Sequence, residues 1–217
     1  MTELVTEQSR RKDAGYYANL RPDLVEMLPR PLGRVLDVGC GAGTVAQQVR
    51  AEGAERVVGI ELDRDAAEAA QEVCDQVLAT SVEVALDELE GPFDTILTYD
   101  VLEHLVDPWL VLRRLREITA PGGRLQVSVP NARHLSLVVD LLFRGTFGYT
   151  EFAHRDITHL RWFTRRDIVA AVADAGWKVQ AVSHSPVSAP RRLLERLTFG
   201  RSSEFLVLQW YVLATNE

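Results

Sequence analysis

Acidic and imidazole side chains that can hold a cation or move a proton meet in one short stretch, Asp100-Val-Leu-Glu-His104. If this stretch begins a helix, Asp100, Glu103 and His104 stand at positions i, i+3 and i+4 and share one face of the turn. An aspartate followed three residues later by a glutamate also fits a capping box, which would explain both acids without any chemistry. The stretch by itself is compatible with either interpretation.

A second candidate site is the run Val35-Leu-Asp-Val-Gly-Cys-Gly-Ala-Gly-Thr44, in which three glycines stand at alternate positions. Glycine between a buried strand and a helix lets the backbone approach a ligand closely and tolerates a positive φ. Glu61 ends the next predicted strand, where a carboxylate can bind the ribose hydroxyls of a nucleotide cofactor. A dinucleotide fingerprint needs a glycine where Thr44 stands, so a nicotinamide oxidoreductase is the less favoured alternative.

Strand-like apolar runs alternate along the chain with stretches of helical spacing, and this alternation must position both sites. Strands are expected at residues 34–38, 56–61, 76–79, 93–99, 124–129, 177–183 and 205–215. Helices are expected at residues 44–52, 65–73, 108–119 and 164–175. The pattern predicts a doubly wound α/β fold with a mostly parallel, seven-stranded sheet. Residues 131–160 interrupt it after the fifth strand and are expected to form a lid over the substrate, within one domain of 217 residues.

The glycine run preceded by Asp37 resembles motif I of the class I S-adenosylmethionine (SAM) methyltransferases, and the resemblance extends over roughly residues 15–180. It implies a Rossmann-like fold and SAM as the methyl donor. It also implies that Asp37 lies near the methionine ammonium group, that Gly39, Gly41 and Gly43 lie beneath the cofactor, and that Glu61 binds the ribose diol.

The resemblance assigns further cofactor contacts around the ends of three strands. Ser81 stands where many relatives have an acid that binds the adenine amino group, and a hydroxyl makes a weaker bond there than a charged group. Val82 is expected beside the adenine and Leu62 against its face, although Leu62 could equally be an ordinary buried leucine. Tyr99, at the end of the fourth strand, is expected beneath the methionine part.

The acidic stretch is followed farther along by His154-Arg-Asp-Ile-Thr-His-Leu-Arg-Trp-Phe-Thr-Arg165. Together the two stretches resemble the metal-dependent small-RNA 2′-O-methyltransferases and the ubiquinone-pathway O-methyltransferases. Carried over residue by residue, the metal ligands are Asp100, Glu103, His104 and His159. The aspartate shortens the first ligand arm by one methylene relative to the RNA branch.

Two carboxylates and two imidazoles suit Mg²⁺, Mn²⁺, Fe²⁺ or Zn²⁺. A bound cation lowers the pKa of a substrate hydroxyl and directs its oxygen, so we take Asp100, His104 and His159 as candidate catalytic residues. A metal-free site with His104 or His159 as general base is the alternative. The expected reaction is methyl transfer to a hydroxyl of a small molecule, a vicinal sugar diol or a catechol or polyketide phenol.

Charge and composition narrow the classes of partner. The formal net charge is −7, with 14 acids and one base in residues 61–107 but 15 bases and 9 acids in residues 108–217. An acidic protein binds long polyanions poorly, so nucleic acid, and RNA 2′-O-methylation with it, is disfavoured. The excess of bases in residues 108–217 suits a methyl acceptor that carries a negative charge. No apolar run is long enough to cross a bilayer and the N-terminus does not resemble an export signal, so we expect a cytoplasmic protein. A homodimer is compatible with the sequence.

Overall fold

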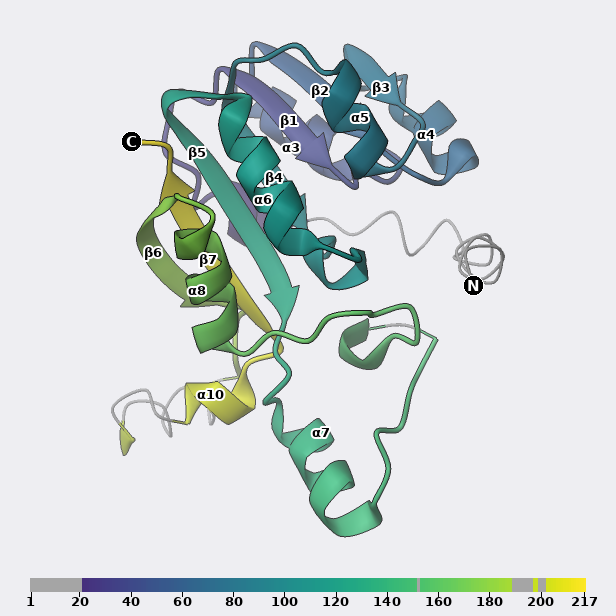
Figure 1. Cartoon of the computed structure of the whole chain (residues 1–217), viewed down its shortest axis with the longest axis vertical. Coiled ribbons are helices and arrows are strands. Elements are labelled where there is room, and N and C mark those ends of the chain that lie inside the picture. Colours follow the sequence, from purple (N-terminus) through teal and green to yellow (C-terminus); the bar gives the residue numbers. More distant parts are fainter. Residues whose placement is uncertain (1–20, 152, 189–196, 199–201) are drawn as a thin grey trace.

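The computed structural model describes residues 21–151, 153–188, 197–198 and 202–217. Its centre is a seven-stranded sheet with the order β3-β2-β1-β4-β5-β7-β6 (Figure 1). The strands are β1 (Arg34–Val38), β2 (Arg56–Ile60), β3 (Gln76–Leu78), β4 (Phe93–Tyr99), β5 (Thr119–Pro130), β6 (Lys178–His184) and β7 (Gln209–Thr215). The first five strands run parallel, and β7 is antiparallel to both β5 and β6. The predicted fold class is confirmed.

Helices cover both faces of this sheet. Neighbouring residues of a strand point to opposite faces, so each strand contributes side chains to two cores. Leu36 belongs to the core beneath α5 (Val82–Glu88), α6 (Pro108–Glu117) and α8 (Arg165–Asp174). Val35 belongs to the core of the opposite face, beneath α2 (Pro22–Val25) and α3 (Thr44–Ala51), with α4 (Arg64–Ala70) at its margin. The strands are therefore apolar on both sides, as a parallel sheet requires.

The strand order reverses between β1 and β4, since β1 continues into β2 on one side and pairs with β4 on the other. Asp37 lies opposite Gly59 of β2 and Leu97 of β4. In doubly wound folds, ligands bind outside the carboxyl ends of the strands at such a reversal. Both stretches singled out from the sequence follow these two strands directly.

Within the sheet and the helices that cover it, three elements differ from the prediction by more than three residues: α5, β5, which begins at Thr119 rather than at residue 124, and the last strand. Helix α5 was not predicted at all, and the last strand begins at Gln209 rather than at Phe205, which lies in the short helix α10 (Ser203–Leu206). The side chain of Asn131 donates hydrogen bonds to the carbonyl oxygens of Glu204 and Val207, which fixes this turn at the end of β5. A short apolar run does not distinguish helix from strand, so the extension of the strand to residue 205 was wrong.

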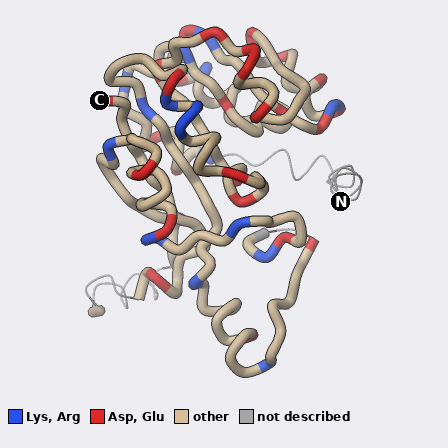
Figure 2. The backbone as a smooth tube through the Cα atoms, in the orientation of Figure 1, with Lys and Arg blue, Asp and Glu red and all other residues tan. Residues whose placement is uncertain are grey.

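The segment after β5 contains α7 (Leu135–Val139), the π-helical turn η2 (Asp140–Arg144) and the 3₁₀ turn η3 (Ala153–Arg155). Figure 1 shows it projecting from the carboxyl end of β5, away from the sheet. Figure 2 shows acidic residues, in red, at many places along the part of the backbone that carries α4 and α5. Among the described residues, no helix has the length and apolar composition needed to cross a bilayer.

Candidate active site

The glycine run forms a tight turn between β1 and α3. Gly39, Gly41 and Gly43 have φ values of 72°, 54° and 85°, a region that favours glycine. The N–H groups of Gly39 and Cys40 both donate to the carbonyl oxygen of Ile60, which ties the turn to β2. A Cβ atom on Gly39 would lie 2.5 Å from Cγ2 of Val101, so the turn also packs directly against the segment that follows β4.

Glu61 lies at the end of β2, with its carboxylate directed into this turn. Its Oε2 accepts a hydrogen bond of 2.9 Å from the N–H of Gly41, and its Oε1 accepts one of 2.8 Å from the N–H of Asp63. Burial raises the pKa of the Glu61 carboxyl, and the backbone hydrogen bonds oppose that rise. A carboxylate can accept about four hydrogen bonds, so the Glu61 carboxylate keeps acceptor capacity that suits a ribose hydroxyl.

Asp37 is the second buried acid of this site, with 2% of its surface exposed. Burial, and then the charge of Glu61, raise the pKa of the Asp37 carboxyl to about 7. Its Oδ2 is buried and has no hydrogen-bond partner within the described part of the chain. An acid in this state is stabilised by a cation, and the ammonium group of a methionine moiety would supply one.

The other expected cofactor contacts lie around the same edge of the sheet. Ser81 precedes the first residue of α5 and Val82 is buried, whereas Leu62 is 53% exposed. Tyr99 is buried and its hydroxyl donates to Oε1 of Gln126, so its polar end is engaged in the core. Adenine and methionine contacts at these four residues stay predictions.

Glu103, His104 and His159 come together just beyond β4. Each offers one ligand atom, and these atoms lie within 4.8 Å of one another. The two imidazole rings meet edge to face with their centres 4.7 Å apart, and Nε2 of His159 lies 4.0 Å from Oε1 of Glu103. Glu103 and His159 are buried. The two sequence stretches that we paired by resemblance therefore form one cluster, which we call the Glu-His-His cluster.

Backbone hydrogen bonds hold the two stretches of this cluster together. The carbonyl oxygen of Glu103 accepts from the N–H groups of Leu160 and Arg161, at 2.8 and 2.9 Å. These donors directly follow His159 in the chain. The position of His159 is therefore fixed relative to Glu103 by the main chain as well as by the side chains.

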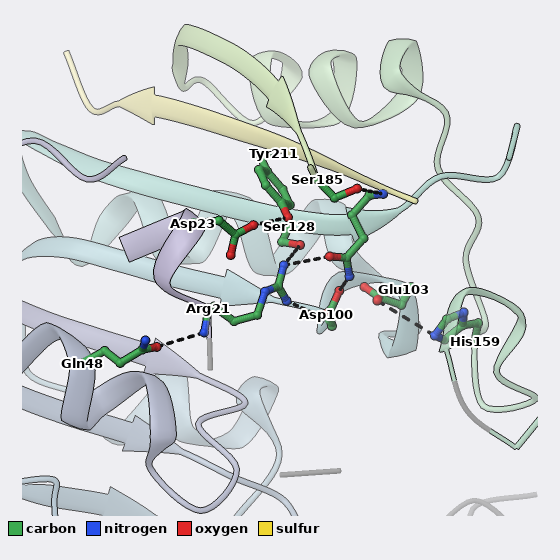
Figure 3. A network of polar contacts seen from close by, with 10 residues as sticks. Arg21, Asp23, Gln48, Asp100, Glu103, Ser128, His159, Ser185 and Tyr211 are labelled. Atoms are coloured by element: carbon green, nitrogen blue, oxygen red, sulfur yellow. Dashed lines mark hydrogen bonds and ion pairs between the residues drawn. The ribbon is translucent and has the colours of Figure 1, made fainter. Parts of the chain in front are cut away.

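The structure places Asp100 elsewhere. Its φ is 56°, and the 3₁₀ turn η1 covers only Leu102–His104 with Val101 before it, so both the shared helical face and the capping box were wrong for Asp100. Oδ2 of Asp100 accepts from Nη1 of Arg21 at 2.6 Å and Oδ1 accepts from Nε2 of Gln209 at 2.5 Å (Figure 3). Interactions with distant segments outweigh the local helical preference. Among the described residues, the group placed to bind a cation does not include Asp100.

Arg21 is the centre of that second network, which no sequence pattern predicted. Its Nη2 donates to Oγ of Ser128 at 3.0 Å and to Oε1 of Gln209 at 2.8 Å, and its guanidinium carbon lies 5.7 Å from the ring centre of Tyr99. Arg21 therefore joins the ends of β4, β5 and β7 (Figure 3). A single arginine before the first predicted strand carries no local pattern that would have revealed this role.

The comparisons with known proteins agree with this geometry. Residues 9–182 match the profile of a protein family described as "Methyltransferase domain". The chain belongs to this methyltransferase family. Its methyl donor is SAM, and this decides against the nicotinamide-dependent alternative.

The methyltransferase is also similar to individual proteins. It is 33% identical over 149 residues to a ubiquinone biosynthesis O-methyltransferase of Chromobacterium violaceum, and the match covers 61% of this chain but only 64% of that protein. It shares its fold with a SAM-dependent methyltransferase of Archaeoglobus fulgidus, with a TM-score of 0.64 and 17% identity over 99% of this chain and 94% of the other. A second fold relative, from Mesorhizobium loti, gives a TM-score of 0.60 and 19% identity over 89% and 96%.

Proposed function

We propose that this methyltransferase transfers the methyl group of SAM to a hydroxyl oxygen of a small molecule, a vicinal sugar diol or a catechol or polyketide phenol. The observation that carries the proposal is the Glu-His-His cluster, which lies directly after β4 and one turn from the segment that packs against Gly39. The similarity to a ubiquinone biosynthesis O-methyltransferase supports oxygen as the acceptor atom.

We propose further that the Glu-His-His cluster holds a divalent cation. The donor set of the cluster fits a divalent cation. Two imidazoles and one carboxylate that leave coordination positions open are typical of Zn²⁺ and Fe²⁺ sites, whereas Mg²⁺ prefers oxygen ligands. When bound, the cation would lower the pKa of the acceptor hydroxyl. Glu103, His104 and His159 would orient the acceptor. Its oxygen forms the bond to the methyl carbon, the carbon–sulfur bond breaks, and the hydroxyl proton passes to solvent.

The surroundings of α7 suit an anionic acceptor. A cavity of about 390 Å³ is lined by His134, Ser136, Arg144, Arg155 and Phe205, among others. Nη1 of Arg144 and Nη1 of Arg155 each donate to one oxygen of Asp140, at 2.7 and 2.6 Å. Two arginines against one aspartate leave one excess positive charge at this cavity, which favours a carboxylate or phosphate on the acceptor.

The test is a panel of catechols and sugar diols, each with and without an anionic substituent, assayed with SAM in the presence and absence of a chelator. We expect a methyl ether product, about a tenfold or greater loss of rate on chelation, and recovery with Zn²⁺, Mn²⁺ or Fe²⁺. Methylation that the chelator leaves unchanged would contradict the cation. Methylation of nitrogen or carbon acceptors alone would contradict the proposed acceptor atom.

A further inference from the structure

Besides its ring contact with His159, His104 lies against Thr158, which no sequence pattern indicated. Nδ1 of His104 lies 3.1 Å from Oγ1 of Thr158 and 3.3 Å from the carbonyl oxygen of the same residue. Which of these groups donates and which accepts depends on the tautomer of the imidazole. The neighbours of Thr158 decide the question.

The hydroxyl of Thr158 is already committed as a donor. Its Oγ1 lies 2.7 Å from Oδ1 of Asp156, and the same Oδ1 accepts the N–H of Thr158 at 2.8 Å. Asp156 is buried, with 1% of its surface exposed. An oxygen that accepts the backbone N–H acts as an acceptor for the hydroxyl as well. Since a hydroxyl has one proton, Oγ1 of Thr158 can only accept from His104.

Both Thr158 atoms that face Nδ1 of His104 are therefore acceptors, because the carbonyl oxygen has no proton to give. Nδ1 must carry the proton. In a neutral imidazole the lone pair is then on Nε2.

We propose that Asp156 and Thr158 are positioning residues that fix His104 in the Nδ1–H tautomer and so present Nε2 as its ligand atom. The part that concerns the cation rests on the proposed function, whereas the tautomer does not. The arrangement places a carboxylate behind the imidazole, with a hydroxyl between them, and such outer contacts orient a ligand ring and raise its basicity.

Asp156 supports the second imidazole as well. Its carbonyl oxygen accepts the N–H of His159 at 3.1 Å. The four residues from Asp156 to His159 thus form one turn. The Asp156 carboxylate binds the Thr158 hydroxyl that contacts His104, and the main-chain hydrogen bond of the turn holds His159. The backbone of the same turn continues into the two N–H groups that bind Glu103. The turn and the two residues after it therefore contact all three members of the Glu-His-His cluster.

The experiment compares Thr158→Val with Thr158→Ser. Valine removes the hydroxyl at nearly constant size, whereas serine keeps it. Thr146→Val is the matched control, because the hydroxyl of Thr146 lies in the same inserted segment and accepts from the N–H of Gly148. SAM affinity and thermal unfolding report whether each variant is folded.

The first readout is the tautomer, measured by two-bond ¹H–¹⁵N NMR of the imidazoles in the metal-free protein at a pH where the rings are neutral, with His104→Gln for assignment. We expect the Nδ1–H form in the wild type, in Thr158→Ser and in Thr146→Val. In Thr158→Val we expect a mixture with the Nε2–H form, since the carbonyl oxygen of residue 158 remains. An Nε2–H wild type would overturn the proposal.

The second readout is Zn²⁺ affinity by calorimetry. We expect Thr158→Val to weaken it by about 10- to 100-fold, with Thr158→Ser close to the wild type and SAM affinity unchanged. Equal loss in the serine and valine variants, or no loss in either, would overturn the positioning role. If the wild type binds no Zn²⁺, Mn²⁺ or Fe²⁺, the proposed cation site fails, and the NMR readout still decides the tautomer. Should Thr158→Val fail to fold, Asp156→Asn and Thr158→Ser are compared in the same two measurements.

Discussion

The glycine turn and the Glu-His-His cluster are built in different ways, although they are neighbours. The glycine turn, with Asp37 and Glu61, comes from one continuous unit, β1, α3 and β2, and its hydrogen bonds join adjacent parallel strands. The Glu-His-His cluster joins a turn after β4 to a segment beyond the insertion after β5. The first site depends on local geometry and the second on long-range backbone contacts.

The difference suggests a division of labour. The glycine turn and its two acids would determine SAM affinity, whereas the Glu-His-His cluster would act on the acceptor and leave SAM affinity alone. The two sites are close, since Gly39 packs against Val101, two residues before Glu103, and distance alone therefore does not separate their effects. Variants of His159 and Glu61 test this separation directly, whereas Arg21→Ala tests what holds the end of β4 and the pH dependence tests the charge of Asp37.

His159→Ala should lower the rate of methyl transfer by about a thousandfold, because it removes one of the three proposed ligands or, in a metal-free site, one of the two candidate bases. The SAM dissociation constant should stay within about twofold of the wild type, as measured by calorimetry. His184→Ala, which changes an imidazole on β6 outside the cluster, is the control. Equal losses of SAM affinity and turnover in His159→Ala would end the separation of the two sites.

Glu61→Ala should raise the SAM dissociation constant by about a hundredfold, because it removes a charged acceptor for ribose hydroxyls and for two backbone N–H groups of the loop. The turnover of bound SAM should change much less. Glu68→Ala, an exposed acid on α4, serves as the comparison in the same titration. A larger effect on turnover than on binding would place Glu61 in the acceptor site instead.

Arg21→Ala should lower the free energy of unfolding by about 2 kcal/mol, measured by urea denaturation. It would leave Asp100 without its ion pair at a strained φ of 56°. The Arg21 and Asp100 side chains are 14% and 32% exposed, which keeps the expected loss below that of a fully buried pair. Arg21→Lys should recover part of the stability. A neutral result would show that the network does not hold the end of β4.

The pH dependence of SAM binding gives the smallest effect. Burial and Glu61 raise the pKa of Asp37 to about 7, so the group is protonated below that pH in the absence of SAM. If the Asp37 carboxylate binds the methionine ammonium, as the resemblance implies, affinity should fall about tenfold from about pH 8 to about pH 6. The sign for folding is the reverse. The unfolded acid loses its proton near pH 4, so Asp37 destabilises the SAM-free protein increasingly as the pH rises toward 7.

Asp37→Asn is the control for this titration. It should bind SAM weakly and with little change across the same range of pH. An unchanged slope in the variant would assign the pH dependence to another group.

The sequence predicted the glycine turn well because the residues that shape it are close neighbours. Three glycines require a turn with positive φ, and an apolar strand on each side places Glu61 beside that turn. The strand positions, the fold class and the family were all available from such local patterns. Helix α5 and the start of the last strand were not, since short apolar runs suit either kind of element.

The second site shows what the sequence could not supply. Asp100 was placed with Glu103 and His104 on spacing alone, but its hydrogen bonds reach Arg21 and Gln209, which are 79 and 109 residues away in the chain. Thr158 and Asp156 stand one and three residues before His159, which we had chosen, and only their contacts with His104 gave them a role.

Local spacing thus determined the glycine turn, the order of strands and helices, and the types of residue that could meet beyond β4. Tertiary structure decided which of them do meet. A residue held at an unfavourable φ costs about 1–3 kcal/mol, and an ion pair or hydrogen bond contributes a similar free energy. The helical preference of a short turn is of the same size, so partners from distant segments can reverse what adjacent residues favour. For Asp100 they did so, and for Glu103, His104 and His159 they brought two separate stretches into one cluster.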